Sequence, residues 1–117
     1  SYPVFHTDAS QAFISEEVYV EKLGVDLLTL DSSKVYGPRG VGLLFIKKST
    51  PILPIIFGGG QENNIRSGTE NYPGIIGLAK ALDIVSECRE LEVKRLLGLR
   101  RYFVESLKSL PSSMFSP

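Results

Sequence analysis

The sequence predicts an α/β fold, in which a mostly parallel sheet is flanked by helices and followed by a long helical region. Three largely apolar runs, at 4–7, 25–30 and 41–46, are bounded by glycine, proline or polar residues and predict strands. The near-continuous apolar character of the second run is typical of strands buried on both faces, as in parallel sheets. From residue 71 onward, apolar side chains recur at helical spacing. An order of strand, helix, strand, strand and long helix is typical of part of an α/β domain.

The first strand, at Val4–Thr7, is followed by a loop and a short helix. We expect Ser15 to be the N-cap of this helix, because a serine oxygen can accept a hydrogen bond from a free N–H group of the first turn. Glu16 and Glu17 would then lie in the first turn, where carboxylates suit the helix dipole. Gly24 is predicted to end the helix, since glycine readily adopts a left-handed C-terminal conformation.

The second half of the chain is predicted to be helical. Before it, Ile55–Phe57 is expected to be a short extended piece between prolines and a glycine-rich loop. Asn71 is expected to cap the helix, with Pro73 in the first turn, where proline is tolerated. The apolar face is formed by Ile75, Ile76, Leu78, Ala79, Leu82, Val85, Val93, Leu96, Leu99, Phe103, Leu107 and Leu110. The pattern leaves open whether the helix runs through 86–90 or breaks there.

Composition narrows the classes of partner. The chain has 117 residues, enough for one modest domain. Its 13 basic and 13 acidic side chains give zero net charge, so there is no electrostatic reason to expect nucleic acid or an anionic membrane as a partner. The single cysteine, Cys88, excludes a disulfide framework and a multi-cysteine metal site, and no metal is predicted. Without a signal peptide or a bilayer-spanning apolar run, a cytoplasmic location is expected.

The segment Asp31–Gly40 carries a lone lysine, Lys34, between a predicted strand and a Gly-Pro-Arg-Gly turn. Glycine and proline restrict the backbone beyond the lysine, so this position can hold an amine in place. A positioned lysine amine is a nucleophile toward carbonyls and a Schiff-base partner for pyridoxal phosphate. On this segment alone, a solvent-exposed lysine at a strand end is an equally good interpretation.

Two further segments favour a Schiff-base lysine over a solvent-exposed lysine with no such role. They are Phe5–Gln11, which reads Phe-His-Thr-Asp-Ala-Ser-Gln, and the glycine-rich Gly58–Asn71. In this order, the three segments together resemble the cofactor-holding core of cysteine desulfurases of the NifS/IscS type. These are fold-type I enzymes that use pyridoxal 5′-phosphate. The resemblance covers nearly the whole chain and implies that it is part of the large domain of such an enzyme.

Both ends of the sequence favour a fragment. The chain opens almost directly into a predicted core strand, whose neighbours would have to come from other sequence. It stops in a turn-rich stretch, where a chain would leave a helix and continue. We therefore expect residues 1–110 to form a partial cofactor-binding domain and residues 111–117 to begin a connection to a missing small domain.

The resemblance assigns Asp8 to the ring nitrogen of the cofactor, which must stay protonated for the ring to act as an electron sink. An aspartate at the carboxyl end of a buried strand suits this role, because ligands of open α/β sheets collect there. The alternative is an aspartate that caps a turn. Gln11 matches the glutamine that hydrogen-bonds the phenolic oxygen of the cofactor. His6 shares a face with Asp8 by strand alternation, and we favour a structural role for it over a cofactor contact.

By resemblance, Lys34 is the Schiff-base lysine and also moves protons at the substrate α-carbon. Many relatives have a serine three residues before this lysine and a histidine directly before it, both near the phosphate. Those positions hold Asp31 and Ser33 here. An ionised Asp31 would repel phosphate, so the expected phosphate donors are Ser32 and Ser33.

The glycine-rich segment is expected to serve a second subunit. Gly58–Gly60 could supply N–H groups to an anion, or could be only a flexible turn. Thr69 matches a threonine that donates to the phosphate of the cofactor in the other subunit, which implies a homodimer with shared active sites. Arg66 either holds this loop or approaches phosphate. Cys88 is not expected to be the catalytic nucleophile, because neighbouring acids disfavour a thiolate. The family's nucleophilic cysteine and its substrate-carboxylate arginine would lie beyond Pro117.

The resemblance implies that the full-length parent converts L-cysteine to L-alanine and passes sulfur to an acceptor protein, for iron–sulfur cluster assembly or tRNA thiolation. The glycine-rich segment favours desulfurases over the related selenocysteine lyases. One alternative is another fold-type I aminotransferase or lyase. A second is a non-catalytic fragment with only a structural or dimer-contact role. The fragment alone is expected to be inactive, and no direct nucleic-acid or membrane contact is expected.

Overall fold

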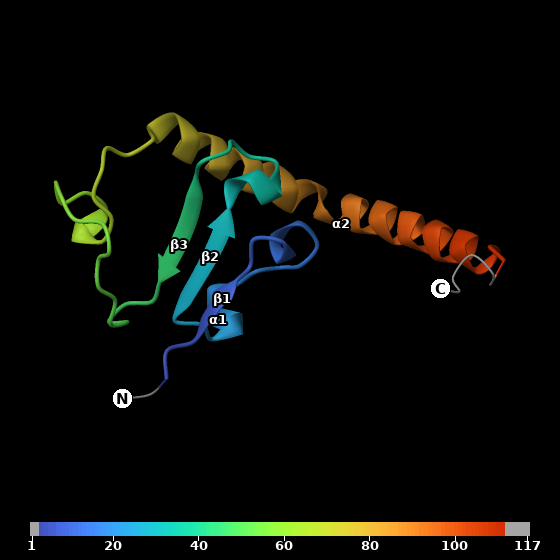
Figure 1. Ribbon diagram of the computed structural model, residues 1–117, viewed down its shortest axis with the longest axis horizontal. Helices are drawn as coiled ribbons and strands as arrows, with labels where there is room; N and C mark the ends of the chain where they lie inside the picture. Colours follow the sequence, from blue (N-terminus) through green and yellow to red (C-terminus); the bar gives the residue numbers. More distant parts are fainter. Residues whose placement is uncertain (1–2, 112–117) are drawn as a thin grey trace.

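A small sheet lies beside one long helix in the computed structural model, which describes residues 3–111 (Figure 1). The elements are β1 (His6–Asp8), η1 (Ala12–Ile14), α1 (Val20–Leu23), β2 (Leu27–Asp31), η2 (Ser32–Val35), β3 (Gly42–Ile46), η3 (Glu62–Asn64) and α2 (Tyr72–Lys108). Elements labelled η are short 3₁₀ helices. Apart from Pro111, the predicted connection at 111–117 lies outside the described residues.

The sheet has three strands in the order β1-β2-β3. β1 pairs with β2 in parallel, with Asp8 opposite Thr29, and β2 pairs with β3 antiparallel, with Asp31 opposite Gly42. The α/β class is confirmed, and within residues 3–111 the sheet is mixed. A parallel pair needs a crossover of about a dozen residues or more, which the stretch with η1 and α1 provides. The shorter link between β2 and β3 returns the chain in the opposite direction.

The two faces of the sheet differ in chemistry. Leu28 and Leu30 of β2 are buried in a cluster with Ala9 and Val25, and Leu82 of α2 packs against this cluster. Side chains alternate between faces along a strand, so the intervening residues of β1 and β2 share the other face. That face is less buried and carries polar side chains toward the carboxyl ends of β1 and β2.

The turn after β2 is packed tightly against α2. Val35 of η2 is fully buried in a second cluster with Leu78 and Val85 of α2. A β-carbon added at Gly77 would lie 2.5 Å from Cγ of Pro38, closer than two such atoms can approach. Glycine at this position of α2 therefore allows the turn to lie directly on the helix, so that η2 packs against α2.

One predicted helix boundary is wrong and another is confirmed. α1 begins at Val20 and follows Tyr19, so Ser15 is not its N-cap. Ser15 instead ends η1, where its N–H donates to the carbonyl of Ala12 at 3.0 Å. Gly24 ends α1 in the left-handed conformation with φ of 65°, as predicted.

The helical region is one continuous helix of 37 residues, with no break at 86–90. The predicted cap is confirmed, since the side-chain oxygen of Asn71 accepts a hydrogen bond from the N–H of Gly74 at 3.2 Å. Before the helix, Ile56 forms a single parallel bridge with Arg66, which agrees with the short extended piece predicted there.

The second half of α2 extends away from the sheet (Figure 1), and the whole structure measures 61 × 36 × 31 Å. Large apolar side chains are exposed along this half: Leu91, Leu97, Leu99, Tyr102 and Phe103. Among residues 3–111, no helix is both long and apolar enough to cross a membrane.

Candidate active site

The carboxyl ends of β1 and β2 bring three ionisable groups together. Asp8 is the last residue of β1, and Asp31 is the last residue of β2. Because the two strands are parallel, both carboxylates lie at the same edge of the sheet. The pKa of Asp31 is lowered, first by hydrogen bonds from Ser33 and further by the charge of Lys34, whereas the charge of Asp8 opposes this shift. Lys34 and Asp8 therefore both influence the charge of Asp31 at this edge.

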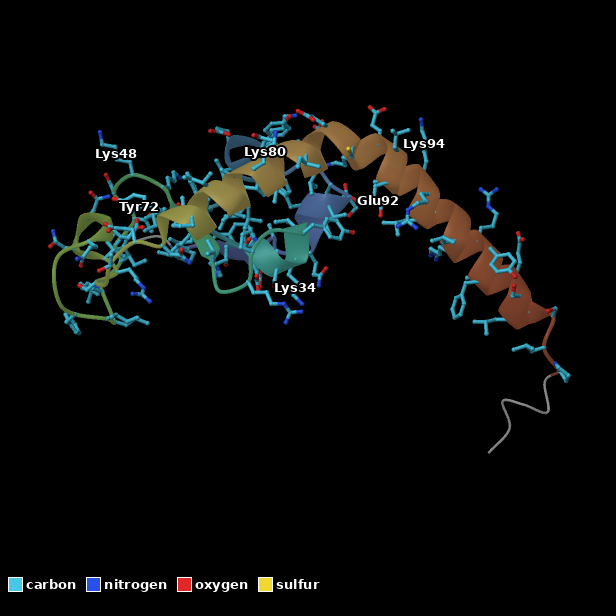
Figure 2. All side chains as sticks on the ribbon, turned by 90° about the horizontal axis from the view of Figure 1, so that it is seen from above. Lys34, Lys48, Tyr72, Lys80, Glu92 and Lys94 are labelled. Carbon is cyan, nitrogen blue, oxygen red and sulfur yellow. The ribbon has the colours of Figure 1, made fainter. Side chains whose placement is uncertain are left out.

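Lys34 lies in η2, the short helix that follows β2 directly. Its side chain is exposed on the side of η2 turned away from α2 (Figure 2). The next residue, Val35, is fully buried, and Tyr36 ends the helix with φ of 63°, in the left-handed region. The N–H of Gly37 donates to the carbonyl of Ser32 at 2.8 Å and closes the turn. The amine is thus presented to solvent from a backbone that is held at both ends.

The Asp8 carboxylate is held in its ionised form. The hydroxyl and the N–H of Ser10 donate to it, the N–H at 2.9 Å, and lower its pKa below the ordinary value of 3.8. His6 adds a smaller electrostatic effect in the same direction. The Nε2 of His6 is 2.6 Å from Oγ1 of Thr29, so its ring is tied to the sheet, which supports a structural role. Gln11 is exposed at the start of η1, three residues after Asp8.

An exposed amine near an ionised carboxylate fits the aldehyde and ring-nitrogen ends of pyridoxal phosphate. The phosphate end fits less well. Ser33 donates its N–H and its hydroxyl to Oδ1 of Asp31, each at 2.8 Å. Ser32 is fully buried, and its Oγ has no hydrogen-bond partner in the part of the chain that the structure describes. Neither expected phosphate donor therefore offers a free hydroxyl at the surface.

An open depression of about 410 Å³ lies beside η2, and it contains a basic side chain that the sequence analysis did not assign to the site. It is lined by Leu30, Asp31, Ser33, Arg39, Gly40, Val41 and Gly42. The contact between Asp31 and Ser33 was also missed. Its sequence signal was an aspartate two residues before a serine, a spacing that allows the side chain to close a turn.

Thr69 lies in a different part of the molecule. The loop at 49–71 is at one end of the structure, away from η2 in both views (Figures 1 and 2). Thr69 is exposed within it. Arg66 donates from Nη1 to the carbonyl of Ser67 at 2.5 Å, so its guanidinium braces this loop. The structure does not bring Thr69 to the lysine within one chain.

Cys88 is exposed on α2, in the middle of a continuous helix. It borders a depression of about 230 Å³, which is lined by Ile14, Tyr36, Ile84, Val85, Cys88, Arg89 and Glu92. This lining is mostly apolar, and the helix gives the thiol no freedom to travel toward a substrate. Among residues 3–111, no three His, Cys, Asp or Glu side chains converge as a metal ion would require.

Comparison with known proteins gives one consistent family. The family model described as "Aminotransferase class-V" matches residues 3–116. The cysteine desulfurase IscS of Dictyoglomus turgidum is 48% identical over 111 residues, which cover 95% of this chain and 28% of that protein. The selenocysteine lyase of Rattus norvegicus is 50% identical over 107 residues, which cover 89% of this chain and 24% of that protein.

Among solved structures, a NifS-like protein aligns with a TM-score of 0.86 and 42% identity, over 90% of this chain and 29% of that one. The NifS-like protein of Rickettsia africae aligns with a TM-score of 0.88 and 31% identity, over 93% of this chain and 30% of that one. The chain thus spans about a quarter of the length of the curated relatives it matches. Its fold is that of part of the NifS-like, fold-type I enzymes. Since the family match runs over nearly all of its residues, the chain belongs to the aminotransferase class-V family.

Proposed function

We propose that this chain forms the cofactor-holding part of a pyridoxal 5′-phosphate-dependent cysteine desulfurase, with L-cysteine as substrate. The observation that carries the proposal is the exposed amine of Lys34 at the same sheet edge as the ionised carboxylate of Asp8. The resemblance to cysteine desulfurase IscS and to NifS-like structures supports the choice of reaction.

Each residue of the site has a role that its chemistry allows. When bound, pyridoxal phosphate supplies an electron sink for bond cleavage at the substrate. Lys34 would hold the cofactor through its amine and, once displaced by the substrate amine, would move a proton at the substrate α-carbon. Asp8 would accept a hydrogen bond from the ring nitrogen, and its lowered pKa keeps it anionic at neutral pH. Gln11 would donate its amide N–H to the phenolic oxygen.

The proposed reaction breaks the bond between the β-carbon and the sulfur of L-cysteine. A proton replaces the sulfur on the β-carbon and gives L-alanine, while the sulfur joins a protein thiol and forms a persulfide. We do not assign that thiol to Cys88, because a rigid helix holds it in place. From the persulfide, sulfur would pass to an acceptor protein that serves iron–sulfur cluster assembly or tRNA thiolation.

The phosphate end requires contributions from outside the lysine turn. Ser33 could donate to phosphate only by releasing Asp31, and Ser32 would have to leave its buried position. Thr69 is exposed and distant from η2, which suits a contact with the cofactor of a second subunit. We therefore propose a homodimer with shared sites. We also propose a cytoplasmic location.

The test is to incubate the protein with pyridoxal phosphate, reduce it with borohydride and map the modified peptide by mass spectrometry. Label confined to Lys34 is expected. An unreduced sample of the full-length parent, given L-cysteine and a thiol reductant, is expected to release alanine and sulfide. Label spread over other exposed lysines such as Lys48 and Lys94 would contradict the assignment of the site.

A second candidate is a selenocysteine lyase, which the 50% identity to the rat enzyme favours. Parallel assays of the full-length parent with L-cysteine and L-selenocysteine separate the two. Turnover of L-cysteine supports the desulfurase, and turnover confined to L-selenocysteine supports the lyase. Turnover of a different amino acid would indicate another fold-type I aminotransferase or lyase. Failure of both substrates, together with unselective labelling, would leave a structural or dimer-contact role.

A further inference from the structure

We propose that Asp31 is a positioning residue, which fixes η2 by accepting hydrogen bonds from Ser33 and thereby orients Lys34. This inference rests on the proposed function, since it requires Lys34 to be the lysine that holds the cofactor. It gives a role to a carboxylate that lines the open depression beside η2 and whose own charge would repel a phosphate group.

The geometry joins the end of β2 to the start of the lysine turn. Asp31 is the N-cap of η2, with an extended backbone at φ of −107° and ψ of 122°. Its Oδ1 accepts both the N–H and the hydroxyl of Ser33 at 2.8 Å. The first N–H groups of a helix have no partner within it, so a cap satisfies them. A helix of only four residues has few internal bonds that could replace this contribution.

The other side of Lys34 is held by the core. Val35 is fully buried against Leu78 and Val85 of α2. Lys34 therefore lies between one neighbour, Ser33, that is bonded to the sheet and another that is packed against the helix. Loss of the Asp31 cap removes one of the bonds that hold the segment before Lys34, where the N–H of Ser32 also donates to the carbonyl of Val41 at 3.0 Å.

The charge of Asp31 suits this role. The hydrogen bonds from Ser33 lower its pKa, the charge of Lys34 lowers it further, and Asp8 opposes them. Arg39, which lines the same depression, adds a positive charge nearby. The carboxylate is therefore anionic at neutral pH, and an ionised carboxylate only accepts hydrogen bonds, as this cap requires.

The first test measures the cap itself, by amide hydrogen exchange over residues 32–36. In Asp31→Ala we expect exchange to become about three- to tenfold faster, which is the usual effect of losing a cap. Asp31→Asn should exchange like the unmutated protein, because its amide oxygen accepts the same two bonds. Asp83→Ala, at an exposed aspartate of α2, is the matched control and should change nothing. Thermal melting of each variant verifies that it is folded.

The second test measures the consequence for Lys34, by the rate of reductive labelling with pyridoxal and, separately, with pyridoxal 5′-phosphate. In Asp31→Ala we expect labelling of Lys34 to be about threefold slower with both aldehydes, because the amine is less well oriented. Asp31→Asn should restore the rate. Pyridoxal has no phosphate, so it isolates positioning from repulsion of the phosphate group.

Four outcomes would overturn the inference. One is an unchanged labelling rate in Asp31→Ala despite faster exchange, which would make the cap purely structural. A second is Asp31→Asn behaving like Asp31→Ala, and a third is an effect confined to pyridoxal phosphate. Both would mean that Asp31 acts through its charge. If the unmutated protein shows no preference for Lys34, the proposed function fails and the positioning role fails with it. The exchange data would still show whether the cap exists.

Discussion

At the scale of single residues, two serines lower the pKa values of the two carboxylates at the candidate site. Asp8 and Asp31 end the two parallel strands, and each accepts hydrogen bonds from the serine two residues further on, Ser10 and Ser33. The same local arrangement thus occurs twice at one edge of the sheet. Because hydrogen bonds to a carboxylate favour its ionised form, both pKa values are lowered.

For Asp8, we predict that Ser10→Ala raises the pKa of the carboxyl group toward 3.8, since the hydroxyl bond is the largest cause of its shift. The folded-state pKa is below the unfolded value, so this group stabilises the fold above the unfolded pKa. That contribution is lost as the pH falls through the folded pKa. An NMR titration of the Asp8 carboxyl measures the change. Ser15→Ala is the control, because that hydroxyl donates to a backbone carbonyl. Equal titration curves in all three proteins would refute the prediction.

For Lys34, we predict that Lys34→Ala removes the visible absorbance of bound pyridoxal phosphate. In the full-length parent, turnover of L-cysteine should fall by about 10²- to 10⁴-fold, the usual contribution of a positioned acid–base group. Spectra and alanine formation are the measurements. Lys48→Ala, at an exposed lysine just after β3, should behave like the unmutated protein. Retained absorbance in Lys34→Ala would remove this lysine from its assigned role.

At the scale of elements, the sequence correctly predicted helix ends that depend only on neighbouring residues. The glycine that ends α1 and the asparagine that caps α2 were correct, because each depends on one backbone conformation or one nearby N–H group. Ser15 was wrong because its hydroxyl and its N–H both turn back to Ala12, which ends η1 before α1 can start. The antiparallel direction of β3 was not predicted from the sequence. It depends on the short connection between β2 and β3, and the 3₁₀ helix η2 within that connection has no clear periodicity in the sequence.

In the candidate site too, local features were predicted from the sequence and contacts between distant residues were not. The sequence predicted that Asp8 ends one strand and that Lys34 follows another, and the parallel pairing of β1 with β2 brings these strand ends to one edge. The burial of Ser32 was not found, because it depends on how η2 packs against α2. A β-carbon at Gly37 would meet Oγ of Ser32 and, at 3.3 Å, Cβ of Ala81. Such a contact between residues distant in sequence leaves no local signal.

The packing of α2 against the lysine turn gives a matched pair of substitutions. Gly77→Ala should destabilise the protein by about 1–3 kcal/mol, because its β-carbon would overlap the ring of Pro38. Gly98→Ala lies in the same helix, and its β-carbon would have no atom of the described residues within 4 Å. That change should stabilise by about 0.5–1 kcal/mol through helix propensity. Denaturant unfolding measures both, and equal effects of the two changes would be inconsistent with the packing described.

At the scale of the whole molecule, the chain is more extended than its length requires. Its radius of gyration is 19.4 Å. A compact domain of this length would have a radius of gyration of about 13 Å. The difference comes from the second half of α2, where apolar side chains such as Leu97 and Phe103 are more than half exposed. Exposed apolar patches of this kind mark surfaces that pack against other protein.

We therefore predict that the isolated 117-residue chain binds a hydrophobic dye strongly and releases little sulfide from L-cysteine. Fluorescence of the dye and a sulfide assay are the measurements. Phe103→Lys should reduce dye binding, because it places a charge on the exposed apolar half of α2. Lys94→Arg, on the same half of the helix, keeps the charge and serves as control. Sulfide release at the rate of a full-length relative would contradict this prediction.

The continuity of α2 gives the lysine turn a mechanical link to the far end of the molecule. Val35 is seated on the first half of the helix, and the second half continues beyond it without a break. From Val85 to Lys108 the helix covers about 35 Å at its usual rise per residue. A tilt of about 5° at the seat of Val35 would thus move the far end by about 3 Å over that length. A force on the far end of α2 would therefore act as a torque at the turn that carries the amine.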